Sequence, residues 1–275
     1  GTSMQRKKAR IYNVLIVISA LVLLLCALMI LWKTRDYRAG DSAYSDTAAL
    51  AVRPRATGAA ATAPPATPDA SGVVTITGTE AMPAAEYAPI EVDFSKLHAA
   101  RGTVVGWLYC EGTVLSYPVA GGKTNEYYLS HLLDGTRNSM GTLYIDDDNA
   151  TDFSDRNTII HGHHMKNGSM FGWLESYRKQ AFYEAHPEMY LLTPDGDYRL
   201  EVLAGYTSEA AGSAYRQWFE DDAAFLAFVR EAMERSDFRS SVSVEPTDRI
   251  VTLSTCAYAF DNARYVIHAR LSPLV

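Results

Sequence analysis

Cys256 is the residue whose chemistry stands out first in this sequence. It follows Arg249–Thr255, a segment rich in residues that favour strands, so the thiol is expected at a strand end, where a side chain is held rigidly. A free thiol has a pKa of about 8.5, and it needs a basic or cationic neighbour to react efficiently at neutral pH. Cys256 is therefore a candidate nucleophile, and a buried structural cysteine is the alternative.

Candidate bases follow a second strand-like segment, Thr158–His161. The chain then turns at Gly162, and His163 and His164 come directly after it. Imidazole suits both proton transfers of acyl exchange. The three histidines could instead be metal ligands, but the sequence has neither an HExxH spacing nor a nearby cysteine pair to complete a zinc site.

Arg264 is the third candidate. It stands eight residues after Cys256, at the start of the strand-like segment Arg264–Leu271. If residues 257–262 form a turn, this strand returns antiparallel to the one that bears Cys256. A guanidinium beside the thiol could bind the substrate backbone or the oxyanion of a tetrahedral intermediate, a role whose loss slows catalysis roughly 10²–10³-fold. A surface ion pair with Asp261 is the alternative.

The elements that must position these residues are mostly short strands. Helical spacing predicts one long helix at Asp221–Arg235 and shorter ones at Met170–Tyr177 and Gln180–His186, and the folded domain begins close to Glu91–Leu97. The patterns predict a mostly antiparallel β-barrel or sandwich with helical insertions. The expected strands are Val104–Tyr109, Val114–Val119, Thr142–Ile145, Thr158–His161, Met189–Leu192, Tyr198–Tyr206, Ile250–Ser254 and Tyr265–Leu271.

The order and spacing of the three candidates resemble those of a sortase. The resemblance rests on three motifs: Thr-Leu-Ser-Thr-Cys, a Gly-His turn about ninety residues upstream, and Arg-Tyr-Val-Ile-His-Ala-Arg-Leu downstream. The resemblance is to the class B branch and runs from about residue 91 to the C-terminus. Further matching segments are Gly106–Tyr109, Tyr117–Val119, Asn125–Leu129, Arg156–Thr158, Gly168–Phe171 and the helix Asp221–Arg235.

This resemblance implies an eight-stranded sortase barrel with N-terminal helices and a long helix before the last two strands. It also implies Cys256 as nucleophile, His163 as acid and base, and Arg264 as stabiliser of the intermediate. His161 and His164 match no catalytic position. Residues implied to line the groove for the substrate peptide are Asn125, Leu129, Ser254 and Tyr215.

The implied activity is that of a cysteine transpeptidase without metal or cofactor. Its partners would be surface proteins that carry a C-terminal sorting signal, cleaved after Thr, and an amine of a peptidoglycan precursor or cross-bridge. A pilin-polymerising sortase, a non-catalytic peptide-binding module and a zinc hydrolase are the alternatives. Class B members often have an acidic residue directly after the cysteine; here Ala257 stands there, although Asp261 could substitute.

The N-terminus predicts a membrane anchor. Residues 1–10 comprise a cloning remnant, Gly1–Ser3, and a basic stretch ending at Arg10; residues 11–33 contain an apolar run long enough to span a bilayer. Positive residues favour the cytoplasmic side, so the catalytic domain, 89–275, is expected outside the cell on a single-pass anchor. A cleaved signal peptide is the alternative, although its apolar part is usually shorter.

Composition completes the expected organisation. Residues 34–88 are rich in Ala, Pro and Thr, which predicts a flexible stalk, because such a segment buries too little surface to offset its ordering entropy. The net charge of −7 argues against a nucleic-acid partner. Cys110 is expected to be a packing residue without a disulfide to Cys256. The acidic segment 146–155, which starts with Asp146-Asp147-Asp148-Asn149 and includes Asp152 and Asp155, is expected to be a solvated loop, with calcium binding as the alternative.

Overall fold

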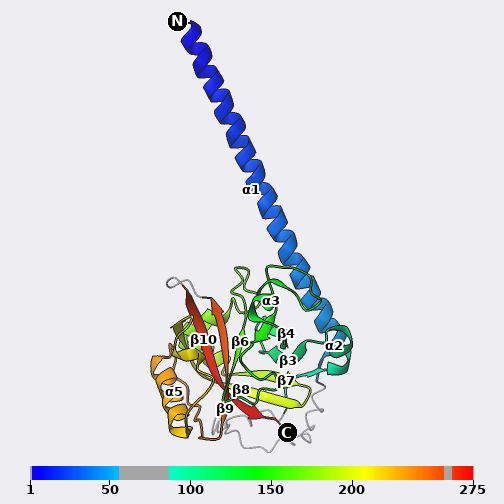
Figure 1. Cartoon of the computed structure of the whole chain (residues 1–275), viewed down its shortest axis with the longest axis vertical. Coiled ribbons are helices and arrows are strands. Elements are labelled where there is room, and N and C mark those ends of the chain that lie inside the picture. Colours follow the sequence, from blue (N-terminus) through cyan, green and yellow to red (C-terminus); the bar gives the residue numbers. More distant parts are fainter. Residues whose placement is uncertain (1, 56–86, 257–261, 275) are drawn as a thin grey trace, which may run out of the picture.

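The computed structural model describes residues 2–55, 87–256 and 262–274, with the backbone alone at residues 2–11 and at Cys256. Its centre is a closed barrel of eight strands, in the order β10-β8-β7-β3-β4-β5-β6-β9 (Figure 1). A barrel, rather than a sandwich, is thus the architecture. The strands are β3 (Val104–Tyr109), β4 (Ser116–Ala120), β5 (Leu143–Ile145), β6 (Asn157–His161), β7 (Glu188–Thr193), β8 (Gly196–Glu209), β9 (Arg249–Cys256) and β10 (Ala263–Pro273).

All eight expected strands are present, with ends that differ by a few residues. Most neighbouring strands are antiparallel, as expected, but β4 pairs with β5 and β6 pairs with β9 in parallel. Parallel neighbours require a crossover connection. The chain between β6 and β9 supplies one, and it contains β7, β8 and α5 (Asp222–Arg235).

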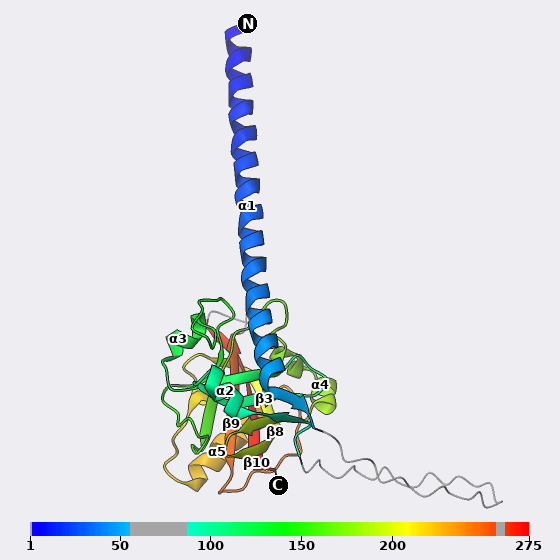
Figure 2. The ribbon, with the colours of Figure 1, turned by 90° about the vertical axis from the view of Figure 1, so that its right-hand side faces the viewer.

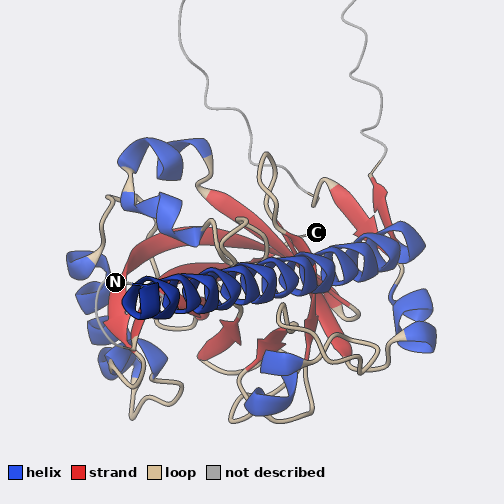
Figure 3. Cartoon of the chain, turned by 90° about the horizontal axis from the view of Figure 1, so that it is seen from above, coloured by secondary structure: helices blue, strands red, loops and turns tan. Residues whose placement is uncertain are grey.

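Helices lie around the outside of the strands (Figure 3). The long helix α5 was expected, and the carboxylate of Asp221 accepts a hydrogen bond from the amide of Ala224 at its start, which satisfies one of the free amides there. The short helix α3 was missed, because six residues are too few to show a helical period. The shorter helices of the barrel domain are α2 (Phe94–Ala100), α3 (Asn125–Ser130), η1 (Leu174–Arg178), α4 (Gln180–Ala185) and η2 (Ser213–Tyr215).

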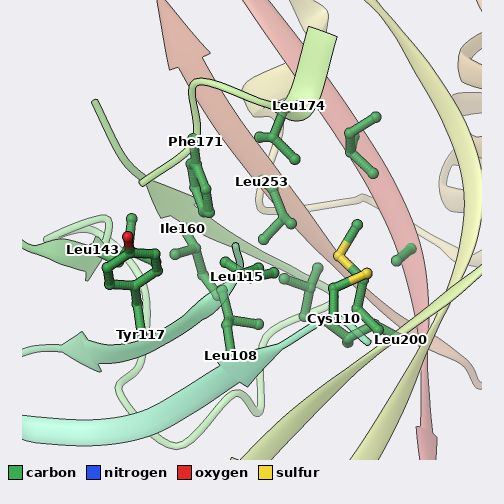
Figure 4. Packing of buried hydrophobic residues seen from close by; sticks show 14 of the residues in the cluster. Leu108, Cys110, Leu115, Tyr117, Leu143, Ile160, Phe171, Leu174, Leu200 and Leu253 are labelled. Atoms are coloured by element: carbon green, nitrogen blue, oxygen red, sulfur yellow. The ribbon is translucent and has the colours of Figure 1, made fainter. Parts of the chain in front are cut away.

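Buried aliphatic and aromatic side chains fill the barrel (Figure 4). Leu108, Leu143, Ile160 and Leu253 come from four different strands and are each at most 1% exposed. Close packing of this kind fixes the positions of the strand backbones, and so of the residues at the strand ends.

The N-terminal helix α1 (Thr2–Ala51) continues far beyond the expected end of the anchor at residue 33 and reaches the barrel domain (Figures 1 and 2). Tyr44, Thr47 and Ala51 are buried on one stripe of this helix, and the hydroxyl of Tyr44 donates to the carbonyl of Gly141. The next residues form β1 (Val52–Pro54), which pairs with β2 (Ile90–Val92).

The expected flexible stalk is therefore wrong for residues 34–55. The docking stripe was missed because its residues are small or polar, apart from Tyr44, and carry little apolar signal. Residues 56–86, the rest of that segment, lie outside the described part of the chain. Within the described part, α1 is the one helix that is long and apolar enough to cross a membrane, judged by length and composition.

Candidate active site

The candidate catalytic positions lie at or just beyond the ends of three neighbouring strands, β6, β9 and β10. In the parallel pair β6–β9, His161 is the Cα partner of Ser254, and the amide of Gly162 donates to the carbonyl of Ser254 at 3.0 Å. His163 lies two residues beyond the last pair of this register, and Cys256 lies two residues beyond Ser254. In the antiparallel pair β9–β10, Cys256 is the Cα partner of Arg264.

His163 is held from two sides. Its Nε2 atom lies 2.7 Å from the carbonyl oxygen of Leu129 in α3, and its own carbonyl accepts a hydrogen bond from the amide of Phe171 at 3.1 Å. A carbonyl can only accept, so Nε2 carries the proton in this arrangement. The preceding Gly162 is tightly enclosed, since a Cβ there would lie 2.6 Å from the ring of Phe171. Backbone and ring are thus both constrained at His163.

Arg264 lies on β10 between Ser208 of β8 and Cys256 of β9. Its guanidinium is half-buried, and Nη1 donates to the carbonyl of Ala263 at 3.1 Å. Asp261, the alternative ion-pair partner, and Ala257 lie outside the described residues.

The four expected groove residues lie around these strand ends. Ser254 is buried on β9, and its Oγ is 2.6 Å from the hydroxyl of Tyr215. Leu129 is 41% exposed. Asn125 begins α3 and exchanges two hydrogen bonds with Asp147, one from each backbone amide to the other side chain. Asp146 and His161 connect Asn125 to Ser254 and Tyr215: Asp146 accepts from Nδ2 of Asn125 and lies 2.8 Å from His161, which stacks on Tyr215 and pairs with Ser254.

Asp146 and His161 are the polar residues that the sequence reasoning missed. His161 Nε2 lies 2.8 Å from Asp146 Oδ2, and only 20% and 15% of the two side chains are exposed. A solvated loop is therefore wrong for Asp146, although Asp147 and Asp148 are exposed as expected. Each of the pair stands at the end of an expected strand, which is the one local signal that could have indicated them.

The charge of Asp146 is stabilised by its partners. Burial by itself would raise the pKa of this carboxyl, but the hydrogen bond and charge of His161, with further donors, lower it to about 2. Asp146 is an anion throughout the physiological pH range. The oxygens of Asp146, Asp147 and Asp148 lie within 4.8 Å of one another, but those of Asp146 are already engaged with protein donors.

Cys110 is a packing residue, as expected. It is 1% exposed, carries a free thiol and lies in the barrel core (Figure 4). Burial raises the pKa of this thiol to about 11, so at neutral pH it is protonated and unreactive.

Comparison with known proteins agrees with this geometry. The family model for the sortase domain matches residues 108–272. Sortase B of Staphylococcus aureus is 35% identical over 184 residues, which is 66% of this chain and 75% of that protein. Sortase B of Listeria monocytogenes is 34% identical over 170 residues, 61% of this chain and 69% of that protein.

Solved structures give the same result. A Staphylococcus aureus sortase B–substrate complex superimposes with a TM-score of 0.63 at 35% identity, covering 66% of this chain and 85% of that one. A structure of sortase B from Bacillus anthracis has a TM-score of 0.61 at 33% identity, covering 66% of this chain and 85% of that one. With a closed barrel in common, a family match over most of the chain and these relatives, this chain belongs to the class B branch of the sortases, a family of cysteine transpeptidases.

Proposed function

We propose that this chain is a membrane-anchored transpeptidase that cleaves a C-terminal sorting signal after Thr and transfers the new carboxyl end to an amine of peptidoglycan. The observation that carries the proposal is the strand register. It pairs Cys256 with Arg264 between β9 and β10 and His161 with Ser254 between β6 and β9, and His163 follows two residues after His161. A base and a cation beside it are the minimum that a thiol needs for acyl transfer.

In the proposed first step, the Cys256 thiolate attacks the carbonyl carbon of Thr, and the carbonyl electron pair moves to oxygen. Arg264 stabilises the resulting oxyanion. The C–N bond then breaks, His163 gives a proton to the departing amine, and a thioester between Cys256 and the substrate remains.

In the second step, an amine of peptidoglycan attacks the thioester carbonyl. His163 accepts the amine proton, the C–S bond breaks, and the thiolate of Cys256 is restored. The histidine alternates between acid and base, and the peptide bond lost in the first step is replaced by a new amide. Because Nε2 of His163 donates to Leu129 in the structure, either that bond opens or Nδ1 takes part in the transfer.

The proposed anchor fits this activity. Helix α1 has the length and composition to span a bilayer, and Tyr44 near its C-terminal end is bonded to the barrel domain. An anchor of this kind would keep the domain at the outer face of the cell membrane, where exported substrates and cell-wall precursors are both found. Expression in cells with a reporter fused to the C-terminus would establish on which side the domain lies.

The test of the reaction uses the full chain and peptides of the Asn-Pro-x-Thr-x type. Mass spectrometry should detect an acyl adduct on Cys256, and Cys256→Ala, His163→Ala and Arg264→Ala should each abolish or greatly slow cleavage. Cys110→Ala is the matched thiol control and should retain cleavage. Full cleavage by Cys256→Ala would refute the proposal. Products formed in cells would distinguish a peptidoglycan amine from a pilin lysine as the acceptor.

A further inference from the structure

Asp146 accepts hydrogen bonds from three separate segments around the active site. Oδ2 accepts from Nε2 of His161 at 2.8 Å and from Nδ2 of Asn125 at 3.1 Å. Oδ1 accepts from Nε2 of Gln217 at 3.1 Å and from the amide of Asp148 at 3.2 Å. One carboxylate therefore ties the start of α3 and the loop before α5 to the end of β6.

His161 also belongs to a stack of aromatic rings. Its ring lies 5.2 Å from that of Tyr144 and 6.1 Å from that of Tyr215, with interplanar angles of 29° and 8°. Tyr144 stacks in turn on Tyr128 of α3, at 5.5 Å. The bond to Asp146 fixes the orientation of the imidazole, and the imidazole supports one face of Tyr215.

Tyr215 connects this stack of rings to β9, the strand that bears Cys256. Its hydroxyl is bonded to Oγ of Ser254, which lies two residues before Cys256 on β9. Ser254 is also the Cα partner of His161. On the other side, Asn125 begins the helix whose Leu129 carbonyl binds His163. The pair formed by His161 and Asp146 thus lies between α3 on one side and the loop of Tyr215 on the other. These two segments border the strand ends.

We propose that His161 and Asp146 are a positioning pair that holds α3 and the loop of Tyr215 at the spacing needed to bind the substrate peptide. This inference rests on the proposed function, because it assumes that the peptide lies beside Ser254. The pair itself does not touch the reacting atoms. Its loss should therefore weaken peptide binding while leaving the chemistry of the thiol intact.

The primary test is Asp146→Asn in the full chain, with Asp148→Asn as the matched control. Asp148 is exposed, and its contact with Asp146 is through its backbone amide, which the control keeps. We expect the KM for a sorting peptide to rise about tenfold in Asp146→Asn, the effect of losing one charge-assisted hydrogen bond. The kcat should change less than about threefold, and Asp148→Asn should match the wild type.

Two substitutions of His161 separate the contributions of the pair. His161→Phe keeps a ring between Tyr144 and Tyr215 but loses the bond to Asp146, whereas His161→Asn keeps a donor and loses the ring. Each should raise the KM, and His161→Phe with Asp146→Asn should raise it little more than either alone, because the two changes break the same contact. These variants also decide the question if Asp146→Asn does not fold.

The rate at which a small thiol reagent alkylates Cys256 is the second readout. It should stay within about twofold of the wild-type rate in all of these variants, since the reagent does not use the peptide groove. An unchanged KM in Asp146→Asn and both His161 variants would overturn the inference. So would a parallel loss of kcat and alkylation rate, which would assign the pair to the thiol chemistry. Failure of the proposed function differs: the wild type itself would then show no Cys256-dependent cleavage.

Discussion

The Nε2 atom of His163 and the carbonyl oxygen of Leu129 are 2.7 Å apart, which makes the short helix α3 the partner that orients the candidate acid and base. The position of the Leu129 carbonyl depends on the segment around Gly141, which packs against it. Gly141 has φ +56°, and a Cβ on it would be 2.5 Å from the carbonyl oxygen of Tyr128 and 2.9 Å from that of Leu129. Only a residue without a side chain fits.

Gly141→Ala should therefore displace the Leu129 carbonyl and lower kcat for peptide cleavage between about tenfold and a hundredfold, because small misplacements of a catalytic group are costly. Steady-state kinetics with a sorting peptide measure this. Gly122→Ala is the matched control: Gly122 also has positive φ, +86°, but a Cβ there meets nothing within 4 Å. Equal losses in the two variants would show that backbone strain, rather than the carbonyl, is responsible.

Tyr44→Phe tests the docking of α1. The hydroxyl of Tyr44 donates to the carbonyl of Gly141 and lies 3.0 Å from Thr142 Oγ1, 5% of the residue being exposed. Removing it leaves a buried carbonyl without this donor, so the free energy of unfolding should fall by about 1–3 kcal/mol. Denaturant unfolding of the full chain in detergent measures the change. Tyr87→Phe, at a residue that is 48% exposed, should have little effect.

His268 should make the domain sensitive to mild acid. Its ring is fully buried between Thr252 and Tyr206, and burial, helped by the charge of Arg235, lowers its pKa to about 3 from the ordinary 6.5. Below pH 6.5 the unfolded chain binds a proton that the folded chain does not. Stability from this group is therefore lost as the pH falls from about 6.5 toward 3, at about 1.4 kcal/mol per pH unit.

Denaturant unfolding at several pH values between 7 and 4 checks this expectation. His268→Gln should have lower stability at pH 7 but a pH dependence smaller by one proton. If the slopes of the variant and the wild type are the same, His268 is not the group responsible.

Asp146 should also lose its stabilising effect in acid, but at lower pH than His268. Its pKa is lowered from the ordinary 3.8 to about 2, so the unfolded chain takes up the proton first as the pH falls. The stabilisation by the carboxylate is fully present above about pH 4 and is lost between about pH 4 and 2. The difference in unfolding free energy between the wild type and Asp146→Asn should therefore be constant above about pH 4 and should shrink between about pH 4 and 2. A difference that is constant from pH 7 to 2 would contradict it.

Local patterns in the sequence were sufficient for much of the barrel. Strand composition predicted all eight strands, and the spacing of Phe225, Phe228 and Val229 predicted α5. The order of a Gly-His turn, a strand ending in Cys256 and a strand beginning with Arg264 indicated the family, which the comparisons show. The catalytic roles of these residues remain predictions.

Only the tertiary structure decided how distant segments meet. His161 and Asp146 are paired because antiparallel β5 and β6 lie side by side, and the sequence carries no local signal of which strands are neighbours. The same holds for Tyr44, whose partners lie about a hundred residues away. Periodicity is a property of a few consecutive residues, whereas pairing and docking depend on the packing of the whole domain. For that reason the sequence was enough to predict Cys256 as a candidate nucleophile, whereas the contacts of His161 and Asp146 could be found only in the tertiary structure.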